Sequence, residues 1–216
     1  MSALTAPTKP LLRGLSHEVA AFGTIAAWGL LAHVASTLRG MVAAVVYGAS
    51  LTALFTTSAV YHRVTLSRRG YAIIRRLDHS TIFVFIAGTY TPFCLLLGGR
   101  RGMMLLCAVW GGALLGVLRA MLWPYAPRVI SAALAVAVGW IVVGVLPALY
   151  TAVGNLQLVL LMAGGLAYTA GALVYAVKWP DPVPNVFGYH EVFHALVVGA
   201  AVCHFAAVVQ TVRVIQ

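Results

Sequence analysis

The chain alternates between long apolar runs and short breaks that are charged or rich in glycine and proline. A helix that crosses a bilayer needs roughly 20 consecutive, mostly apolar residues. The breaks contain residues that end helices, as in Arg39-Gly40 and the segment Pro180–Pro184. The pattern predicts one all-α integral membrane domain over residues 1–216, built as a seven-helix bundle with short connections. The expected spans are Val19–Leu38, Met41–Tyr61, Leu77–Leu97, Gly102–Leu122, Val129–Tyr150, Leu156–Val177 and Phe187–Gln210.

Composition supports a membrane location. Hydrophobic residues make up 62% of the 216, and charged residues only 8%. A soluble domain carries about 25% charged residues, so this chain has too few polar groups to cover a globule in water. We therefore expect a multi-pass protein of the cell membrane, in a bacterium the inner or plasma membrane, with membrane lipids as its main partners. The sequence does not indicate an oligomeric state.

The net charge of +10 arises from fourteen basic and four acidic residues. The basic residues occur in short clusters between apolar runs, which argues against nucleic acid as a partner and for the rule that Lys and Arg gather in cytoplasmic loops. A cytoplasmic N-terminus, and hence an external C-terminus, puts most of them inside. The inner set is then Lys9, Arg13, Arg63, Arg68, Arg69, Arg75, Arg76, Arg119, Arg128 and Lys178, and the outer set is Arg39, Arg100, Arg101 and Arg213.

Several polar residues fall at one predicted depth although they belong to three different helices. His62 ends the second predicted span, and Ser58 precedes it by one turn; Asp78 begins the third span; His190 and His194 lie in the first turns of the last span. All of these positions are at the inner ends of their helices. Polar and ionisable groups inside a membrane are costly, and they mark functional sites by default.

The spacing of the histidines predicts a metal site. His190 and His194 stand four residues apart, so their Cβ atoms lie about 5–6 Å apart on one helix face and both rings can reach one ion. With His62 as a third ligand, the fourth position is open to water, which is the arrangement of a catalytic zinc site. Asp78 and Ser58 are the candidate catalytic residues beside that water, whose pKa zinc lowers to about 7.

Other polar residues have simpler interpretations. We expect His33, His79 and His204 to make packing or hydrogen-bonding contacts, and we ascribe the arginines of 63–76 to topology alone. The segment His190-Glu191-Val192-Phe193-His194 also matches the H-E-x-x-H pattern of zinc proteases, in which the Glu is a general base. A protease would need a third ligand from upstream, so we keep it as an alternative.

The segments around these residues resemble the hemolysin III family, the bacterial branch of the progestin and adipoQ receptor superfamily. The resemblance spans roughly residues 16–207 and is carried by Ser58-Ala59-Val60-Tyr61-His62-Arg63, Leu77-Asp78-His79-Ser80-Thr81-Ile82, Ile86-Ala87-Gly88-Thr89-Tyr90-Thr91-Pro92 and Phe187-Gly188-Tyr189-His190-Glu191-Val192-Phe193-His194. It implies zinc bound by His62, His190 and His194, with Asp78 and Ser58 beside it, and seven helices with an inner N-terminus. Through the similarity of the superfamily to alkaline ceramidases, it also implies amide hydrolysis.

The first helix departs from the family pattern. The family's first motif is E-x2-N-x3-H, and this chain keeps Glu18 but has Ala21 and Ile25 at the Asn and His positions. We expect that His17, which precedes Glu18, does not replace a side chain two turns deeper. The departure bears on catalysis more than on metal binding.

Three functions follow as hypotheses. The first is a zinc-dependent hydrolase of a lipid amide or ester. The second is a non-catalytic membrane sensor or modulator in which structural zinc joins the second and last helices. The third, suggested by the family name, is cytolysis.

Overall fold

A computed structural model describes residues 10–215. Eight α-helices and one 3-10 helix make up this part of the chain. In chain order they are α1 (Leu15–Val34), α2 (Leu38–Arg63), α3 (Arg68–Leu97), α4 (Gly99–Leu122), α5 (Arg128–Gly139), η1 (Trp140–Val145), α6 (Leu146–Ala152), α7 (Asn155–Val177) and α8 (Tyr189–Val214).

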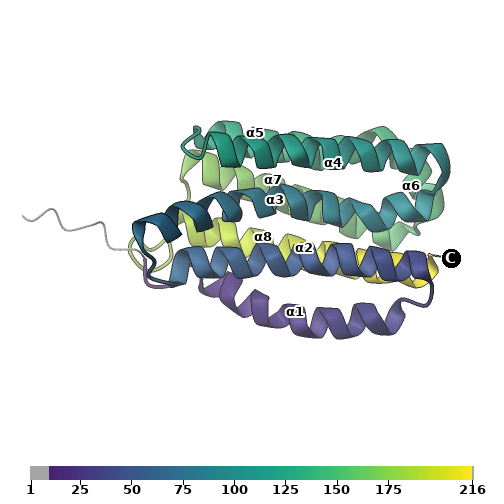
Figure 1. Ribbon diagram of the computed structural model, residues 1–216, viewed down its shortest axis with the longest axis horizontal. Helices are drawn as coiled ribbons and strands as arrows, with labels where there is room; N and C mark the ends of the chain where they lie inside the picture. The colour runs from purple at the N-terminus through teal and green to yellow at the C-terminus, as the bar shows by residue number, and fades with distance from the viewer. Residues whose placement is uncertain (1–9, 216) are drawn as a thin grey trace, which may run out of the picture.

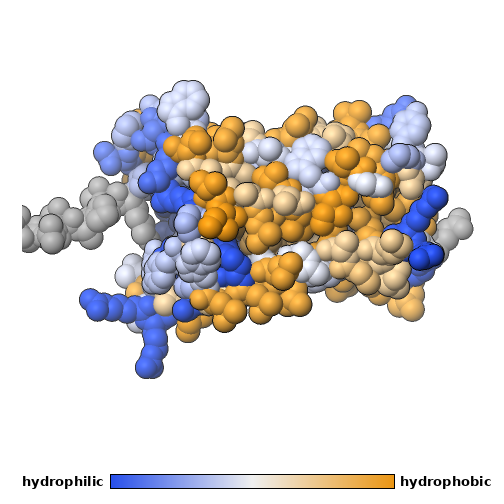
Figure 2. Space-filling view, turned by 90° about the horizontal axis from the view of Figure 1, so that it is seen from above, coloured by the Kyte–Doolittle hydropathy of each residue, from blue (hydrophilic) through white to orange (hydrophobic). Residues whose placement is uncertain are grey.

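Seven helical stretches are long and apolar enough to cross a membrane, with α5, η1 and α6 joined end to end as the fifth span. Figure 2 shows the matching surface, on which hydrophilic residues gather at the two ends and a hydrophobic band lies between them. The prediction of an all-α bundle of seven membrane helices is confirmed, and the chain is a multi-pass membrane protein.

The helices run alongside one another as a bundle, with α1 at one edge and α4 and α5 at the opposite one (Figure 1). Tyr47 of α2, Phe85 of α3 and Val208 of α8 are buried in the main core between these three helices. We call the end of the bundle where α2 finishes and α3, α5 and α8 begin the site end. The C-terminal end of α8 lies at the opposite end of the bundle (Figure 1).

Helix α3 begins earlier than the hydropathy pattern predicts. Ser67 accepts a hydrogen bond from the backbone N–H of Gly70 at 3.1 Å and so caps the helix, which starts at Arg68. The basic stretch that separates the second and third apolar runs is therefore mostly helical, since arginine is a good helix former. Asp78 does not begin α3, as the sequence suggested, but lies ten residues inside it.

The fifth span is broken where the 3-10 helix η1 interrupts it. The Tyr90 hydroxyl donates a hydrogen bond to the Gly139 carbonyl at 2.6 Å and accepts one from the Val142 N–H at 2.9 Å. A single side chain of α3 thus satisfies backbone groups that the break releases. Irregular backbone at membrane depth is tolerated where it is buried in protein or lines a cavity, and Gly139 lines the cavity described below.

Candidate metal centre

Three histidines from two helices converge at the site end. His62 is the penultimate residue of α2, while His190 and His194 occupy the first two turns of α8. One ring nitrogen from each lies within 4.8 Å of those of the other two. His62 is 9% exposed and His194 2% exposed, so the group is largely shielded from solvent. The structure brings together the three ligands that the sequence predicted.

The arrangement fits a zinc ion on chemical grounds. Two imidazole nitrogens bound tetrahedrally to zinc at about 2.0–2.1 Å lie roughly 3.3 Å apart. The Nε2 atoms of His62 and His190 face each other at 3.2 Å. Nδ1 of His194 is buried and has no hydrogen-bond partner in the part of the chain that the structure describes, which is costly for a polar atom unless something else satisfies it. Among the described residues, these three are the group that could hold a metal.

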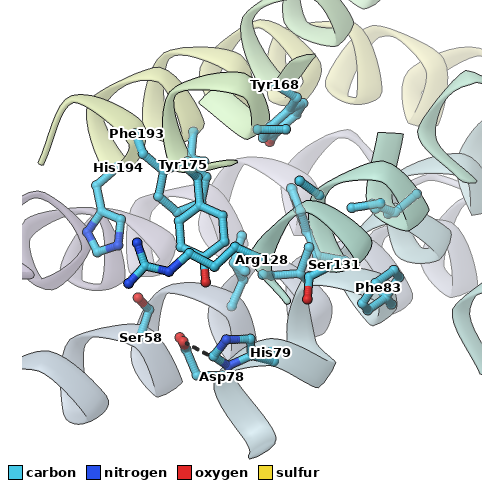
Figure 3. Close-up of a pocket in the computed structure, with 18 of the residues that line it drawn as sticks. Ser58, Asp78, His79, Phe83, Arg128, Ser131, Tyr168, Tyr175, Phe193 and His194 are labelled. Carbon is cyan, nitrogen blue, oxygen red and sulfur yellow. Dashed lines mark ion pairs between the residues drawn. The ribbon is translucent and has the colours of Figure 1, made fainter. Parts of the chain in front are cut away.

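Ser58 and Asp78 lie next to the triad. Ser58 is buried one helical turn before His62, and its hydroxyl lies near the Asp78 carboxyl group. Figure 3 shows the two side chains next to each other, with His194 across from them. Both residues line the same cavity as the triad, so the structure also brings the two candidate catalytic residues to the candidate metal centre.

His17 also lies at the site, although the sequence pattern did not predict it there. It is 3% exposed, and its Nδ1 lies 2.8 Å from the Ser58 hydroxyl oxygen. Its ring stacks on that of His194, with centroids 3.8 Å apart and planes 8° from parallel. This contact was not predicted; His17 reaches the site from the first turn of α1, because α1 begins beside the last turn of α2. Its place directly before the matching Glu18 was the only signal in the sequence.

The two positions at which this chain departs from the family's first motif do not face the site. Ile25 is exposed on the outside of α1, and Ala21 packs against the main core. The contact of α1 with the triad comes from its first turn instead. Gly14, with φ of +79°, lies so close to α2 that a Cβ there would come 2.5 Å from the His62 Cβ.

Two ion pairs tie the start of α1 to neighbouring helices. The Arg13 guanidinium donates a hydrogen bond to Glu191 of α8, and Arg63 of α2 donates one to Glu18 at 2.8 Å. The backbone N–H of Leu11 also donates to the Asn185 carbonyl at 2.9 Å. Together these contacts close the side of the metal centre that faces α1.

The role of Glu191 argues against the protease interpretation. One carboxylate oxygen accepts from Arg13, and the other accepts from the backbone N–H of Gly188 at 2.8 Å, which caps α8. A general base must be free to reach the reacting water. Both oxygens of Glu191 already have partners other than the triad. Glu191 therefore serves to cap α8, and the match to H-E-x-x-H does not indicate a protease.

Two of the other histidines, His204 and His79, make hydrogen bonds of the expected kind. His204 donates a hydrogen bond to the Leu161 carbonyl at 3.0 Å, and His33 is exposed on α1. His79 donates from Nδ1 to the Arg75 carbonyl at 2.8 Å. The same nitrogen is 3.9 Å from the Asp78 carboxylate, so His79 lies closer to the site than the sequence suggested.

A cavity of about 550 Å³ adjoins the metal centre. The triad, Ser58 and Asp78 form one wall of it, and α3, α5 and α7 supply apolar and aromatic walls (Figure 3). Small-molecule sites typically enclose 300–1,000 Å³ and combine apolar walls with a few polar groups. The volume and the lining are therefore those of a ligand site beside the histidines.

The seven spans with a histidine triad at one end define a heptahelical membrane protein with a candidate metal centre. The family model described as Haemolysin-III related matches residues 5–205, and the chain belongs to this family. It is 30% identical to the protein named Hemolysin-3 of Bacillus cereus over 204 residues, which cover 92% of this chain and 89% of that protein.

Two further relatives widen the comparison. The Hemolysin-3 homolog of Bacillus subtilis is 30% identical over 164 residues, covering 76% of this chain and 74% of the relative. The Heptahelical transmembrane protein ADIPOR2 of Oryza sativa subsp. japonica is 34% identical over 179 residues, covering 74% and 76%. The superfamily resemblance noted from the sequence is confirmed.

Proposed function

We propose that the protein is a zinc-dependent hydrolase of a lipid amide or ester, with zinc held by His62, His190 and His194. The observation that carries the proposal is the triad on the wall of a cavity within an apolar bundle. When bound, zinc polarises a carbonyl and makes water nucleophilic near neutral pH. The histidines must be neutral to bind it, since metal affinity falls as its ligands become protonated.

The polar residues beside the triad supply the remaining steps. Asp78 accepts the proton from the attacking water and then gives it to the departing amine or alcohol as its bond to the acyl carbon breaks. Ser58 donates a hydrogen bond to the carbonyl oxygen as that atom gains negative charge, as donors in an oxyanion hole do. His17 holds the Ser58 hydroxyl in place. The apolar part of the cavity takes the acyl chain and keeps bulk water away from the reacting bond.

The second candidate function is a non-catalytic one, in which a structural metal links α2 to α8. The burial of the triad favours it. A metal site with only a structural role has all its positions closed by protein ligands. Here three histidines converge, and a cavity lies beside them. We therefore place the hydrolase first.

The test joins metal content to turnover. The purified wild type should contain about one zinc per chain, and the His62→Ala/His194→Ala double variant should contain none. His33→Ala, which removes an exposed histidine, should keep its metal. Asp78→Asn should retain zinc but lose at least about 100-fold in hydrolysis of the lipid, the contribution typical of a general base.

Two results would count against the proposal. Equal metal content in the wild type and the double variant would remove the metal site. A fully loaded wild type that hydrolyses no lipid amide or ester, and whose double variant is only less heat-stable, would assign the metal to the structural role.

A further inference from the structure

The cavity beside the triad is basic where it approaches the site end. Among the described residues that line it are four arginines and a single carboxylate, Asp78. Arg13 is neutralised by Glu191. The remaining three, Arg75, Arg119 and Arg128, belong to three different helices. Their three positive charges outnumber the single negative charge of Asp78 in the same cavity.

Two of these arginines have buried donors with no partner. The Nε atoms of Arg75 and Arg119 are both shielded from solvent and make no hydrogen bond within residues 10–215. The Arg75 guanidinium lies over the Tyr125 ring at 4.5 Å, which holds it in place. Guanidinium groups with free buried donors are suited to planar, bidentate recognition of carboxylate or phosphate.

Arg128 completes the group from the first turn of α5. It donates a hydrogen bond to the Tyr189 hydroxyl at 2.7 Å and lies over the Tyr175 ring at 5.4 Å. Figure 3 shows its guanidinium reaching from α5 toward the side of the cavity on which Ser58 and His194 lie. Its charge is thereby presented to the cavity close to the candidate metal centre.

The topology rule does not account for these positions. It explains arginines in loops and at helix ends that face water, such as Arg68 and Arg69, both of which are exposed. Arg75 and Arg119 instead line an internal cavity whose walls are mostly apolar, with Phe83, Ile86 and Val136 among them. A ligand that suits both parts has a charged head and a hydrocarbon chain.

We propose that this cavity binds a membrane amphiphile with a phosphate headgroup, held by Arg75 and Arg119 and approached by Arg128. The inference rests on the proposed function and names the substrate class for the same site. Phosphate is favoured over carboxylate because its additional oxygens and charge can engage several guanidinium groups at once. The acyl chain then lies along the apolar walls, with its ester or amide bond near the triad.

The test measures binding directly, in protein purified into neutral detergent. The probes are a monoacylglycerol phosphate, the monoacylglycerol and the fatty acid of the same chain length, and inorganic phosphate. We expect the phosphate amphiphile to bind at least about tenfold more tightly than each of the other three. Arg75→Gln and Arg119→Gln should each weaken its binding by about tenfold or more, the effect of losing one charge-assisted contact.

Arg69→Gln is the matched control, because it removes the same charge at the same end of the bundle outside the cavity. Equal loss in Arg69→Gln would show that general surface charge attracts the probe, and would overturn the site. If the monoacylglycerol or the fatty acid binds as tightly as the phosphate amphiphile, the site does not recognise phosphate. If inorganic phosphate binds as tightly, the acyl chain contributes nothing and the ligand is not an amphiphile. Arg119→Gln decides the question alone if Arg75→Gln does not fold.

The same measurement on the His62→Ala/His194→Ala variant separates this proposal from the hydrolase. Phosphate-amphiphile binding that persists without metal or turnover supports the arginine site even where the hydrolase fails. If the protein hydrolyses a neutral lipid but does not prefer phosphate amphiphiles, the proposed arginine site is wrong. The proposal that the protein is a hydrolase is then unaffected.

Discussion

At the scale of single residues, His17 shows how a side chain outside the predicted ligand set can shape the site. Its ring is parallel to that of His194 at 3.8 Å. The lone pair of an imidazole nitrogen lies in the ring plane, so two rings stacked in this way do not both point at one ion. His17 therefore positions His194 by stacking and Ser58 by hydrogen bonding, in the way that residues around metal ligands fix their orientation.

We expect His17→Ala to lower zinc affinity by about 10–100-fold, the usual effect of removing a residue that orients a ligand. Competition with a chromophoric chelator measures this directly. His33→Ala on the same helix is the control and should have no effect, because His33 is exposed. Unchanged affinity in His17→Ala would show that the packing of α2 and α8 alone orients the ligands.

Arg75 is the second residue whose role changed. The positive-inside rule explains a basic segment before the third span, and that explanation is sufficient for Arg68 and Arg69. Once α3 is extended back to Arg68, Arg75 becomes a helical residue on the cavity side, stacked on Tyr125. Arg75 carries the same positive charge whether it marks topology or lines the cavity. The two interpretations differ only in where the side chain points.

At the scale of helices, close approach depends on small residues. Gly116 of α4 faces Phe83 of α3, and a Cβ at this position would overlap the Phe83 ring. Without a hydrophobic driving force in lipid, membrane helices associate through such tight packing. The same contact places Phe83 in the wall of the cavity.

The Gly116→Ala variant should destabilise the bundle by about 1–3 kcal/mol, the range for overpacking a filled core. Thermal unfolding in detergent, followed by circular dichroism, reports the change. Gly111→Ala on the same helix is the matched control, because nothing lies within 4 Å of a Cβ there. Alanine favours a helix by about 1 kcal/mol over glycine, so this control should be neutral or slightly stabilising. Equal stability of the two variants would contradict the packing argument.

At the scale of the whole molecule, the site and the basic residues share one end of the bundle. The inner set of basic residues predicted from the charge count includes Arg75, Arg119 and Arg128, and all of these lie at the site end with the triad. The topology rule therefore predicts that the cavity takes its ligand from the cytoplasmic side of the membrane.

This orientation is tested by labelling single cysteines in intact cells, after the three native cysteines are replaced. Thr65 lies between α2 and α3, and Asn155 begins α7; both are exposed and uncharged, so replacing them leaves the charge count unchanged. A thiol reagent that does not cross membranes should label Asn155→Cys but not Thr65→Cys. Both should react after the cells are opened. The reverse pattern would place the N-terminus and the site outside.

The sequence by itself determined the features that are read along one stretch of chain. Hydropathy marks the seven spans because each needs only its own apolar residues. The pair His190 and His194 follows from the period of one helix, and the depth of His62 follows from its place at the end of an apolar run. The motifs that carry the family resemblance are likewise short, continuous stretches of the chain.

Only the tertiary structure decided which sides of the helices face each other. In a soluble protein the polar face of a helix points outward, but here lipid covers a surface as apolar as the interior, so the pattern does not indicate rotation about the helix axis. The stacking of His17 on His194, the capping role of Glu191 and the inward direction of Arg75 all depend on that rotation. Each is a contact between residues distant in the chain, and packing between helices alone brings them together.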